Sequence, residues 1–356
     1  MLRSFRVGQL FNIPIFLHWS LLLLPLMAIY SNGSYEPVNI IWTTLFFSLL
    51  FVCVLFHEYG HALSARYYGV DTTDITLLII GGVARLMRLP EKPWQEFVVA
   101  AAGPAVNVVI AVVVYLFLWL TDSSFFPEQQ IIGSHNFLQY FALANISLVV
   151  FNLLPAFPMD GGRMLRAVLN IKLSRLKATY IAKLVGQFLA VLAAGIGIYF
   201  GHYTLIFIAI FVFVSARAEY QGLKQEAFLT NHQVKDAMKQ QFYIVQQSNN
   251  IEYAVQLLTN SGQQHFPVLN MMELNGILTH QQILRAISKK DTFAPISDYM
   301  IKNFMVLSPE DSIRTAYQLF QENRYDLIPI VENGVVIGIL DKAGLNEFFR
   351  IKAAKN

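Results

Sequence analysis

Six apolar runs, each long enough to cross a bilayer, constrain this chain more than any other feature of its sequence. They lie at about 14–30, 39–62, 95–120, 137–157, 178–200 and 203–219. A helix of roughly 20 apolar residues spans the hydrocarbon layer of a membrane. Only 14% of the residues are charged, whereas soluble domains average about 25%. The sequence therefore predicts a polytopic α-helical membrane protein with about six transmembrane helices.

The distribution of Lys and Arg predicts how these spans are oriented. Basic residues precede the first span and fill the loops after the second and fourth: Arg3, Arg6, Arg66, Arg85, Arg88, Lys92, Arg163, Arg166, Lys172, Arg175 and Lys177. The loops at 31–38, 121–136 and 201–202 contain no Lys or Arg. Because cytoplasmic loops carry the excess of basic residues, we predict that both termini are cytoplasmic. A net charge of +3 is too small to indicate nucleic-acid binding, so the lipid bilayer is the expected partner.

A metal-binding pattern, His57-Glu58-Tyr59-Gly60-His61, lies near the end of the second run. Histidines four residues apart share one face of a helix, and two imidazoles at that spacing can bind one Zn²⁺. Glu58 stands beside the first histidine, where a carboxylate can take a proton from the attacking water. Ionisable side chains are costly at membrane depth and mark functional sites. The pattern therefore predicts a zinc site in the membrane, with Glu58 as the base.

A carboxylate follows the fourth run, at Asp160. The predicted topology brings the end of this run to the cytoplasmic side, at the same depth as the two histidines. Taken alone, Asp160-Gly161 is more typical of a turn than of a metal ligand. A catalytic zinc site, however, has three protein ligands and one open position. Asp160 is therefore the predicted third ligand of one Zn²⁺ per chain.

These two motifs together resemble the site-2 protease family of intramembrane zinc metalloproteases. The family pattern, His-Glu-x-x-His in one helix and Asn-x-x-Pro-x(4)-Asp-Gly in another, is matched by His57 to His61 and by Asn152 to Gly161. The resemblance covers about residues 1–220, and it is strongest to the bacterial branch that processes sporulation factors.

This resemblance implies a zinc-dependent endopeptidase that cuts single-span transmembrane proteins in a bacterial inner or plasma membrane. The active site would lie toward the cytoplasmic side. His57, His61 and Asp160 would hold the zinc, and Glu58 would be the catalytic base. The alternative is a metal-ion transporter or channel with the same three ligands along an ion pathway. It would be regulated by the C-terminal CBS (cystathionine-β-synthase-type) domains described below. Glu58 argues against it, because a transport site needs no base beside its first ligand.

Two asparagines extend the resemblance. Asn107 belongs to a Gly-Pro-x-x-Asn element in the third run, and its amide can hold an unwound substrate backbone or a developing oxyanion. A hydrogen bond to a neighbouring helix is an equally open interpretation. Asn152 belongs to the Asp160 motif and is a second candidate for substrate support, and Asn145 is expected to join helices.

Three more candidate substrate-site residues lie near the predicted cytoplasmic side. Gly81 and Gly82 follow a β-branched run that predicts a short β-hairpin between the second and third spans. In the family an edge strand here is thought to clamp extended substrate, although a purely structural hairpin is as consistent with the sequence. His18 lies at the predicted cytoplasmic end of the first span. There it can gate the site or contact the base, and an ordinary interfacial histidine is the other interpretation.

From about residue 221 the chain is polar, and two similar units follow at about 233–290 and 295–350. Equivalent residues recur with a period of about 62: Met238 and Met300, Pro267 and Pro329, Gly276 and Gly338. Such a period indicates an internal repeat, and the repeat resembles a tandem CBS domain pair, which is a soluble α/β fold. We predict a protease domain over 1–220, a linker over 221–232 and the CBS pair over 233–352.

The CBS resemblance implies a regulatory ligand. CBS pairs often bind an adenine nucleotide, with a Thr/Ser-x-x-Asp motif on the ribose. Here the motif is replaced by Thr279-His280-Gln281-Gln282 and Asp341-Lys342-Ala343-Gly344. A nucleotide, a purely structural role and a homodimer through the CBS domains therefore stay open.

Overall fold

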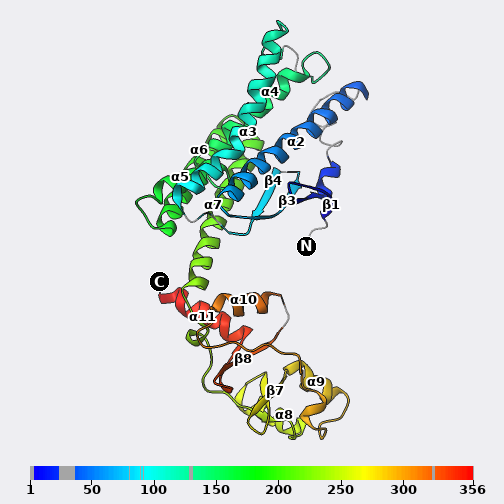
Figure 1. Ribbon diagram of the computed structural model, residues 1–356, viewed down its shortest axis with the longest axis vertical. Helices are drawn as coiled ribbons and strands as arrows, with labels where there is room; N and C mark the ends of the chain where they lie inside the picture. The colour runs from blue at the N-terminus through cyan, green and yellow to red at the C-terminus, as the bar shows by residue number, and fades with distance from the viewer. Residues whose placement is uncertain are drawn as a thin grey trace. The chain divides into compact units, whose positions relative to one another are not determined.

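The computed structural model describes residues 4–23, 37–79, 81–88, 90, 92–127, 131–322 and 325–355. The chain divides into two compact units, Met1–Leu223 and Lys224–Asn356 (Figure 1). The helices of the first unit are α2 (Pro37–Tyr67), α3 (Pro93–Leu120), α4 (Phe137–Leu153), α5 (Asp160–Leu169), α6 (Arg175–Tyr199) and α7 (Tyr203–Thr230), the last of which continues into the second unit.

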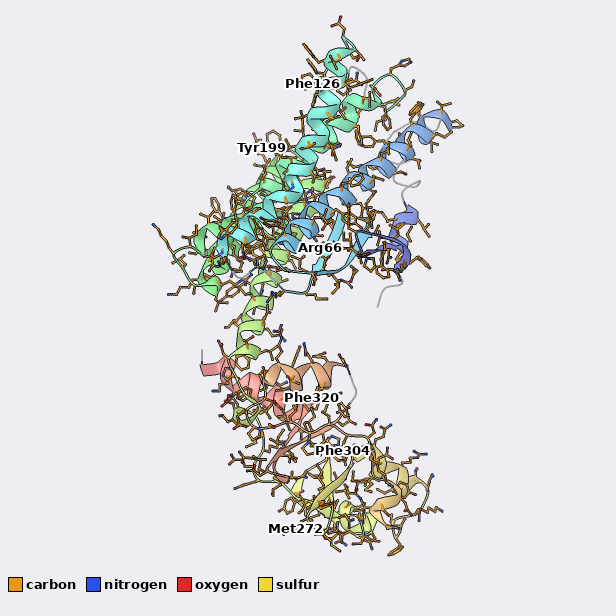
Figure 2. The ribbon with its side chains drawn as sticks, viewed as in Figure 1. Arg66, Phe126, Tyr199, Met272, Phe304 and Phe320 are labelled. Carbon is orange, nitrogen blue, oxygen red and sulfur yellow. The ribbon has the colours of Figure 1, made fainter. Side chains whose placement is uncertain are left out.

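Four helices within the described ranges are long and apolar enough to cross a membrane: α2, α3, α6 and α7. Only 17–33% of their most apolar stretches is buried inside the protein, so most of each helix surface is left for lipid. Figure 2 shows Tyr199 at the end of α6 and Phe126 beyond the end of α3, both largely exposed. α4 is also apolar but has only 17 residues. The helical membrane unit is therefore present, with four candidate spans.

The predicted first span, 14–30, is wrong over its first ten residues. Ile13–His18 is a β-strand, β2, and Trp19–Leu23 is a 3₁₀ helix, η1. Residues 24–30 lie outside the described part of the chain. The strand is apolar because it is central in a sheet and packs on α2, where Ile13, Tyr59 and Ala62 share one buried cluster.

This sheet has four strands in the order β1-β2-β3-β4. β1 (Ser4–Leu10) pairs antiparallel with β2, β2 pairs parallel with β3 (Thr72–Leu78), and β3 pairs antiparallel with β4 (Gly81–Leu86). β3 and β4 lie beside α2 (Figure 1). β4 is therefore an edge strand next to the helix that carries the two histidines.

The second unit is built from two similar runs of elements. The first run is η2 (Val234–Asp236), β5 (Val245–Gln246), α8 (Ile251–Ser261), β6 (Phe266–Asn270), β7 (Glu273–Leu278) and α9 (His280–Ser288). The second is η3 (Ile296–Asp298), α10 (Ile313–Gln321), β8 (Leu327–Glu332), β9 (Val335–Asp341) and α11 (Lys342–Lys355). The repeat in the sequence is thus a repeat of α/β structure.

The two repeats contact each other through two equivalent methionine–glycine pairs. A methyl group in place of the Gly276 hydrogen would lie 2.9 Å from the sulfur of Met300, and one at Gly338 would lie 2.8 Å from that of Met238. Each methionine thus packs on the glycine of the other repeat. The backbones pair alongside, since Ile277 and Ile301 exchange two hydrogen bonds of 3.0 and 2.8 Å. This packing explains why Met and Gly recur in register.

Candidate metal centre

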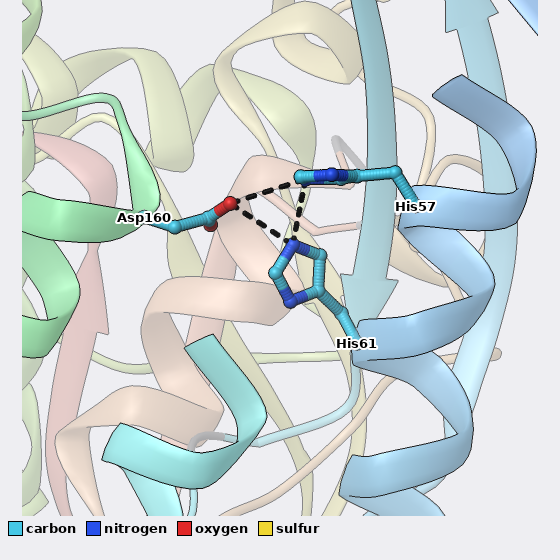
Figure 3. A group of neighbouring side chains, drawn as sticks. All are labelled: His57, His61 and Asp160. Carbon is cyan, nitrogen blue, oxygen red and sulfur yellow. Dashed lines mark hydrogen bonds and ion pairs between the residues drawn. The ribbon is translucent and has the colours of Figure 1, made fainter. Parts of the chain in front are cut away.

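Three predicted ligands meet in one buried cluster (Figure 3). His57 and His61 project from α2, one turn apart, and Asp160 is the first residue of α5. The Asp160 Oδ2 atom lies 3.1 Å from Nε2 of His57 and 3.2 Å from Nε2 of His61, and the two Nε2 atoms are 3.1 Å apart. All three side chains are less than 10% exposed. The structure therefore brings together the three side chains that the sequence predicts as ligands.

The spacing of these atoms fits a tetrahedral zinc site. With metal–ligand bonds of about 2.0–2.1 Å, ligand atoms at two corners of a tetrahedron lie about 3.3 Å apart. The three observed separations are 3.1–3.2 Å. Two histidines and one carboxylate also leave the fourth position open, as catalytic zinc sites do. The residues present therefore fit a catalytic zinc ion.

Hydrogen bonds fix which nitrogen of His61 faces the cluster. Nδ1 of His61 is 2.7 Å from the carbonyl oxygen of Val99. A carbonyl can only accept, so Nδ1 carries the proton, and in the neutral ring Nε2 has a free lone pair. This lone pair is directed at the centre of the cluster.

His57 is oriented by a chain of amides that ends at a helix carbonyl. Asn145 Nδ2 donates to the Phe141 carbonyl at 2.9 Å, so its Oδ1 is free to accept from Asn107 Nδ2 at 3.0 Å. The Asn107 Oδ1 atom then accepts the Nδ1 proton of His57 at 2.7 Å. Metal-binding histidines generally donate their other ring proton in this way. Both asparagines are fully buried, and both functions of the Asn107 amide are used inside the protein.

α3 makes room for the two imidazoles at Gly103. A Cβ atom at this position would lie 2.7 Å from Nε2 of His57 and would also overlap the ring of His61. Glycine is thus required here by the close approach of α2 and α3. Val99, Gly103 and Asn107 are spaced four residues apart on α3 and are all buried. One stripe of this helix therefore supports both histidines.

Asp160 is held at the end of a compact turn between α4 and α5. Gly162 lies against this turn, and a Cβ there would be 2.7 Å from the carbonyl carbon of Ala156. The turn contains a cis peptide bond between Phe157 and Pro158. Asn152 is half-buried on the last turn of α4 and is not among the residues bonded to the three ligands.

Glu58 projects from α2 toward the edge strand β4. Its Oε2 atom accepts the backbone N–H of Ala84 at 2.9 Å. Gly82 lies under the same side chain, since a Cβ there would be 2.5 Å from Cγ of Glu58. Gly81 has a φ of 135°, a conformation that other residues rarely adopt. The two glycines are therefore next to the predicted base.

His18 does not join the cluster. It ends β2, and its Nδ1 atom accepts the backbone N–H of Ser20 at 3.2 Å and lies 2.8 Å from Oγ of the same residue. This hydroxyl oxygen accepts the N–H of Ile79 at 3.2 Å. His18 is 7% exposed. In the structure it connects the end of β2 to the turn between β3 and β4.

Sequence reasoning missed a buried ion network behind Asp160. Arg166 of α5 is fully buried, and its Nε atom donates to Oε1 of Glu96 at 2.6 Å. Its Nη1 atom donates to Oε1 of Glu219, on α7, at 2.8 Å. The guanidinium carbon lies 5.2 Å from the centre of the Phe157 ring. The available signal was an acidic residue just inside an apolar run, at Glu96.

Two histidines on a helix long enough to span a membrane, an aspartate within reach of both and an adjacent carboxylate are the features of a membrane metallopeptidase. Comparison with known proteins agrees. The sequence model of peptidase family M50 matches residues 45–134 and 124–193, and that of the CBS domain matches residues 234–289 and 296–349.

Several known proteins are similar to this chain over most or part of its length. The zinc metalloprotease MJ0392 of Methanocaldococcus jannaschii is 33% identical over 342 residues, which cover 96% of this chain and 95% of that protein. The solved structure of a site-2 protease from the same organism is 37% identical and covers 61% of this chain and 95% of its own, with a TM-score of 0.47. Stage IV sporulation protein FB of Bacillus subtilis is 31% identical over 36% of this chain and 42% of that protein.

The chain belongs to peptidase family M50, and its second unit contains a pair of CBS domains. The predicted site-2 protease resemblance and the predicted zinc metalloprotease class are confirmed, and the transporter alternative is not favoured.

Proposed function

We propose that this protein hydrolyses peptide bonds of single-span membrane proteins at a zinc ion held by His57, His61 and Asp160. One observation carries the proposal. Val99 and the Asn107–Asn145 chain fix the ring protons of both histidines on Nδ1, so two lone pairs and a carboxylate oxygen converge within 3.2 Å. Three acceptors at this distance repel one another unless a cation lies between them.

Bound zinc would polarise the scissile carbonyl and lower the pKa of water to about 7. The chain itself supplies the proton transfer. The Glu58 carboxylate takes the proton of the attacking water and delivers it to the leaving amine, as general base and then general acid. Asn152 is the second-to-last residue of α4, on the segment that leads to Asp160. We propose that it supports the substrate.

The substrate must be extended at the cut, because a helix buries its peptide carbonyls in its own hydrogen bonds. β4 is an edge strand, and edge strands accept a further strand through their free backbone groups. Gly81 and Gly82 begin β4, so a substrate strand there would lie next to Glu58. Single-span proteins are proposed because one short unwound segment is easier to present than a packed bundle.

The proposed topology follows from the basic loops. We propose that α4 also spans the membrane and that both termini and the metal centre face the cytoplasm. The five helices α2, α3, α4, α6 and α7 alone would put the termini on opposite sides, so this topology needs a sixth crossing before α2, where residues 24–30 of the predicted first span lie outside the described part of the chain. The proposed domains are a protease over 1–220, a linker over 221–232 and CBS domains over 233–352, in a bacterial inner or plasma membrane.

A cavity of about 400 Å³ in the CBS unit is the candidate for a second, regulatory site. It is lined by Lys239, His265, Asp341 and Lys342 among others. Its volume falls in the range of small-molecule sites. Lys239, which is 3.1 Å from the Asp341 carboxylate, and Lys342 bring positive charge to the cavity wall. We propose an adenine nucleotide as its ligand, with a homodimer through this unit as the alternative. Calorimetric titration of the full chain with ATP and AMP tests this, and Lys239→Ala should weaken binding.

The main test compares wild type with Glu58→Gln. Both are purified in detergent, assayed for bound zinc, and co-expressed with a panel of single-span reporters. We expect zinc in both proteins and cleavage only by the wild type. Cleavage by neither protein, together with zinc transport that does not depend on Glu58, would establish the transporter instead.

A further inference from the structure

The edge strand β4 makes a specific contact with the side chain of Glu58. Ala84 stands opposite Ile75 in the β3–β4 register, yet its N–H donates to Oε2 of Glu58 at 2.9 Å. Antiparallel residue pairs alternate between hydrogen-bonded and non-hydrogen-bonded types. The Ile75–Ala84 pair is therefore of the second type, and the Ala84 N–H points away from β3.

The space around this contact is shaped by Gly82. Strand residues two apart share an orientation, so Gly82 and Ala84 present the same side of the strand to α2. A Cβ at Gly82 would lie 2.5 Å from Cγ and 2.9 Å from Oε1 of Glu58. The carboxylate is thus confined between the backbone of Gly82 and the N–H of Ala84.

We propose that the Ala84 N–H is a positioning group for the catalytic base and that Gly82 provides the room it needs. The Glu58 side chain has several rotatable bonds. The neighbouring His57 is held by Asn107 and Asp160, but neither of these residues holds Glu58. Without a donor of its own, Glu58 would sample positions away from the attacking water. A backbone N–H bonded to a carboxylate is a strong, charge-assisted contact that selects one position. This inference rests on the proposed role of Glu58 as base.

The test is Ala84→Pro, which removes this N–H and puts the ring carbon Cδ of proline in its place. Proline is accepted on edge strands where the missing N–H makes no ladder bond. We expect kcat on a single-span reporter to fall about 10- to 100-fold, the usual effect of losing a supporting bond, with unchanged KM and bound zinc. Ala84→Val keeps the N–H and should keep kcat. A raised KM with unchanged kcat would overturn the proposal, because the N–H would then serve the substrate backbone.

A second variant, Gly82→Ala, keeps every N–H and displaces the Glu58 side chain instead. It should also lower kcat at unchanged zinc content, whereas Val83→Ala, at an exposed position of the same strand, should not. Wild-type activity in both variants would refute the proposal.

A measurement without catalysis separates this inference from the proposed function. Hydrogen exchange of the segment Gly81–Arg88 should show one protected amide fewer in Glu58→Ala than in wild type. Glu58→Gln, which still offers an acceptor oxygen, should retain the protection. Equal exchange in all three proteins would show that the bond is absent, even if no reporter is cleaved.

Discussion

Replacing Arg166 by methionine should destabilise the membrane unit through one orphaned charge. Methionine has a similar length but cannot pair with Glu96, which is 4% exposed. The remaining cation is Arg175, whose Nη2 atom is 3.5 Å from the other Glu96 oxygen. Glu219 is less affected, because its side chain is 37% exposed and can be solvated.

The magnitude follows from these burial values. Breaking a buried ion pair on one side costs about 3–5 kcal/mol, and Glu96 would keep only the longer, 3.5 Å contact to Arg175. For a unit of this size, each kcal/mol shifts the melting temperature by about 2–4 °C, so we expect a fall of about 6–20 °C. Glu219→Gln, at the partly exposed end of the network, should cost about 1 kcal/mol or less.

Intrinsic fluorescence is a suitable assay. All four tryptophans, Trp19, Trp42, Trp94 and Trp119, belong to the first unit, so thermal unfolding of the full chain in detergent can be followed there. Arg163→Met removes the same charge from a half-buried position of the same helix and should change little.

The double variant Arg166→Met/Glu96→Gln decides the cause. Neutralising Glu96 removes the orphaned charge, so most of the lost stability should return. A wild-type melting temperature for Arg166→Met, or no recovery in the double variant, would refute the reasoning.

Three further outcomes are expected. Asn107→Leu should weaken zinc binding about 10- to 100-fold, measured by competition with a chelating dye, while Val108→Ala on the exposed face of α3 should not. Gly103→Ala should abolish zinc binding, since its methyl group would lie 2.7 Å from Nε2 of His57; retained zinc would contradict the close packing. Burial lowers the pKa of His265 below its usual 6.5. As the pH falls, His265 therefore becomes protonated in the unfolded chain before it does in the folded chain. The contribution of His265 to the stability of the second unit should be complete above about pH 6.5 and should decrease below it. Urea unfolding of the full chain with a Tyr253→Trp probe should show this loss, and His265→Gln should reduce it.

The convergence of the three proposed metal ligands was predictable because few residue types bind zinc and their spacing is strict. Helical periodicity puts His57 and His61 on one face, and the basic loops bring Asp160 to the same side. The supporting contacts were not predictable in this way. The Val99 carbonyl, the Asn107–Asn145 relay and the Arg166 pairings depend on how the helices rotate and slide against one another, which no local pattern specifies.

The error at 14–30 has a different cause. A central strand that is apolar along most of its length resembles a helix segment by composition. Residues 13–17 are apolar, and the run resumes after His18 with further apolar residues that extend it to spanning length. Only the pairing with β1 and β3 reveals the strand. β3 lies beyond α2 in the sequence, so a local window around residues 13–18 does not contain this partner.

The reciprocal methionine–glycine contacts also limit how the CBS unit can unfold. Each repeat supplies a methionine that packs on the glycine of the other. Removing one repeat therefore exposes both a methionine and the backbone at a glycine in the repeat that remains. The pair should therefore melt in a single transition. A truncation after the first repeat should yield a fragment that proteases degrade, not a smaller stable domain.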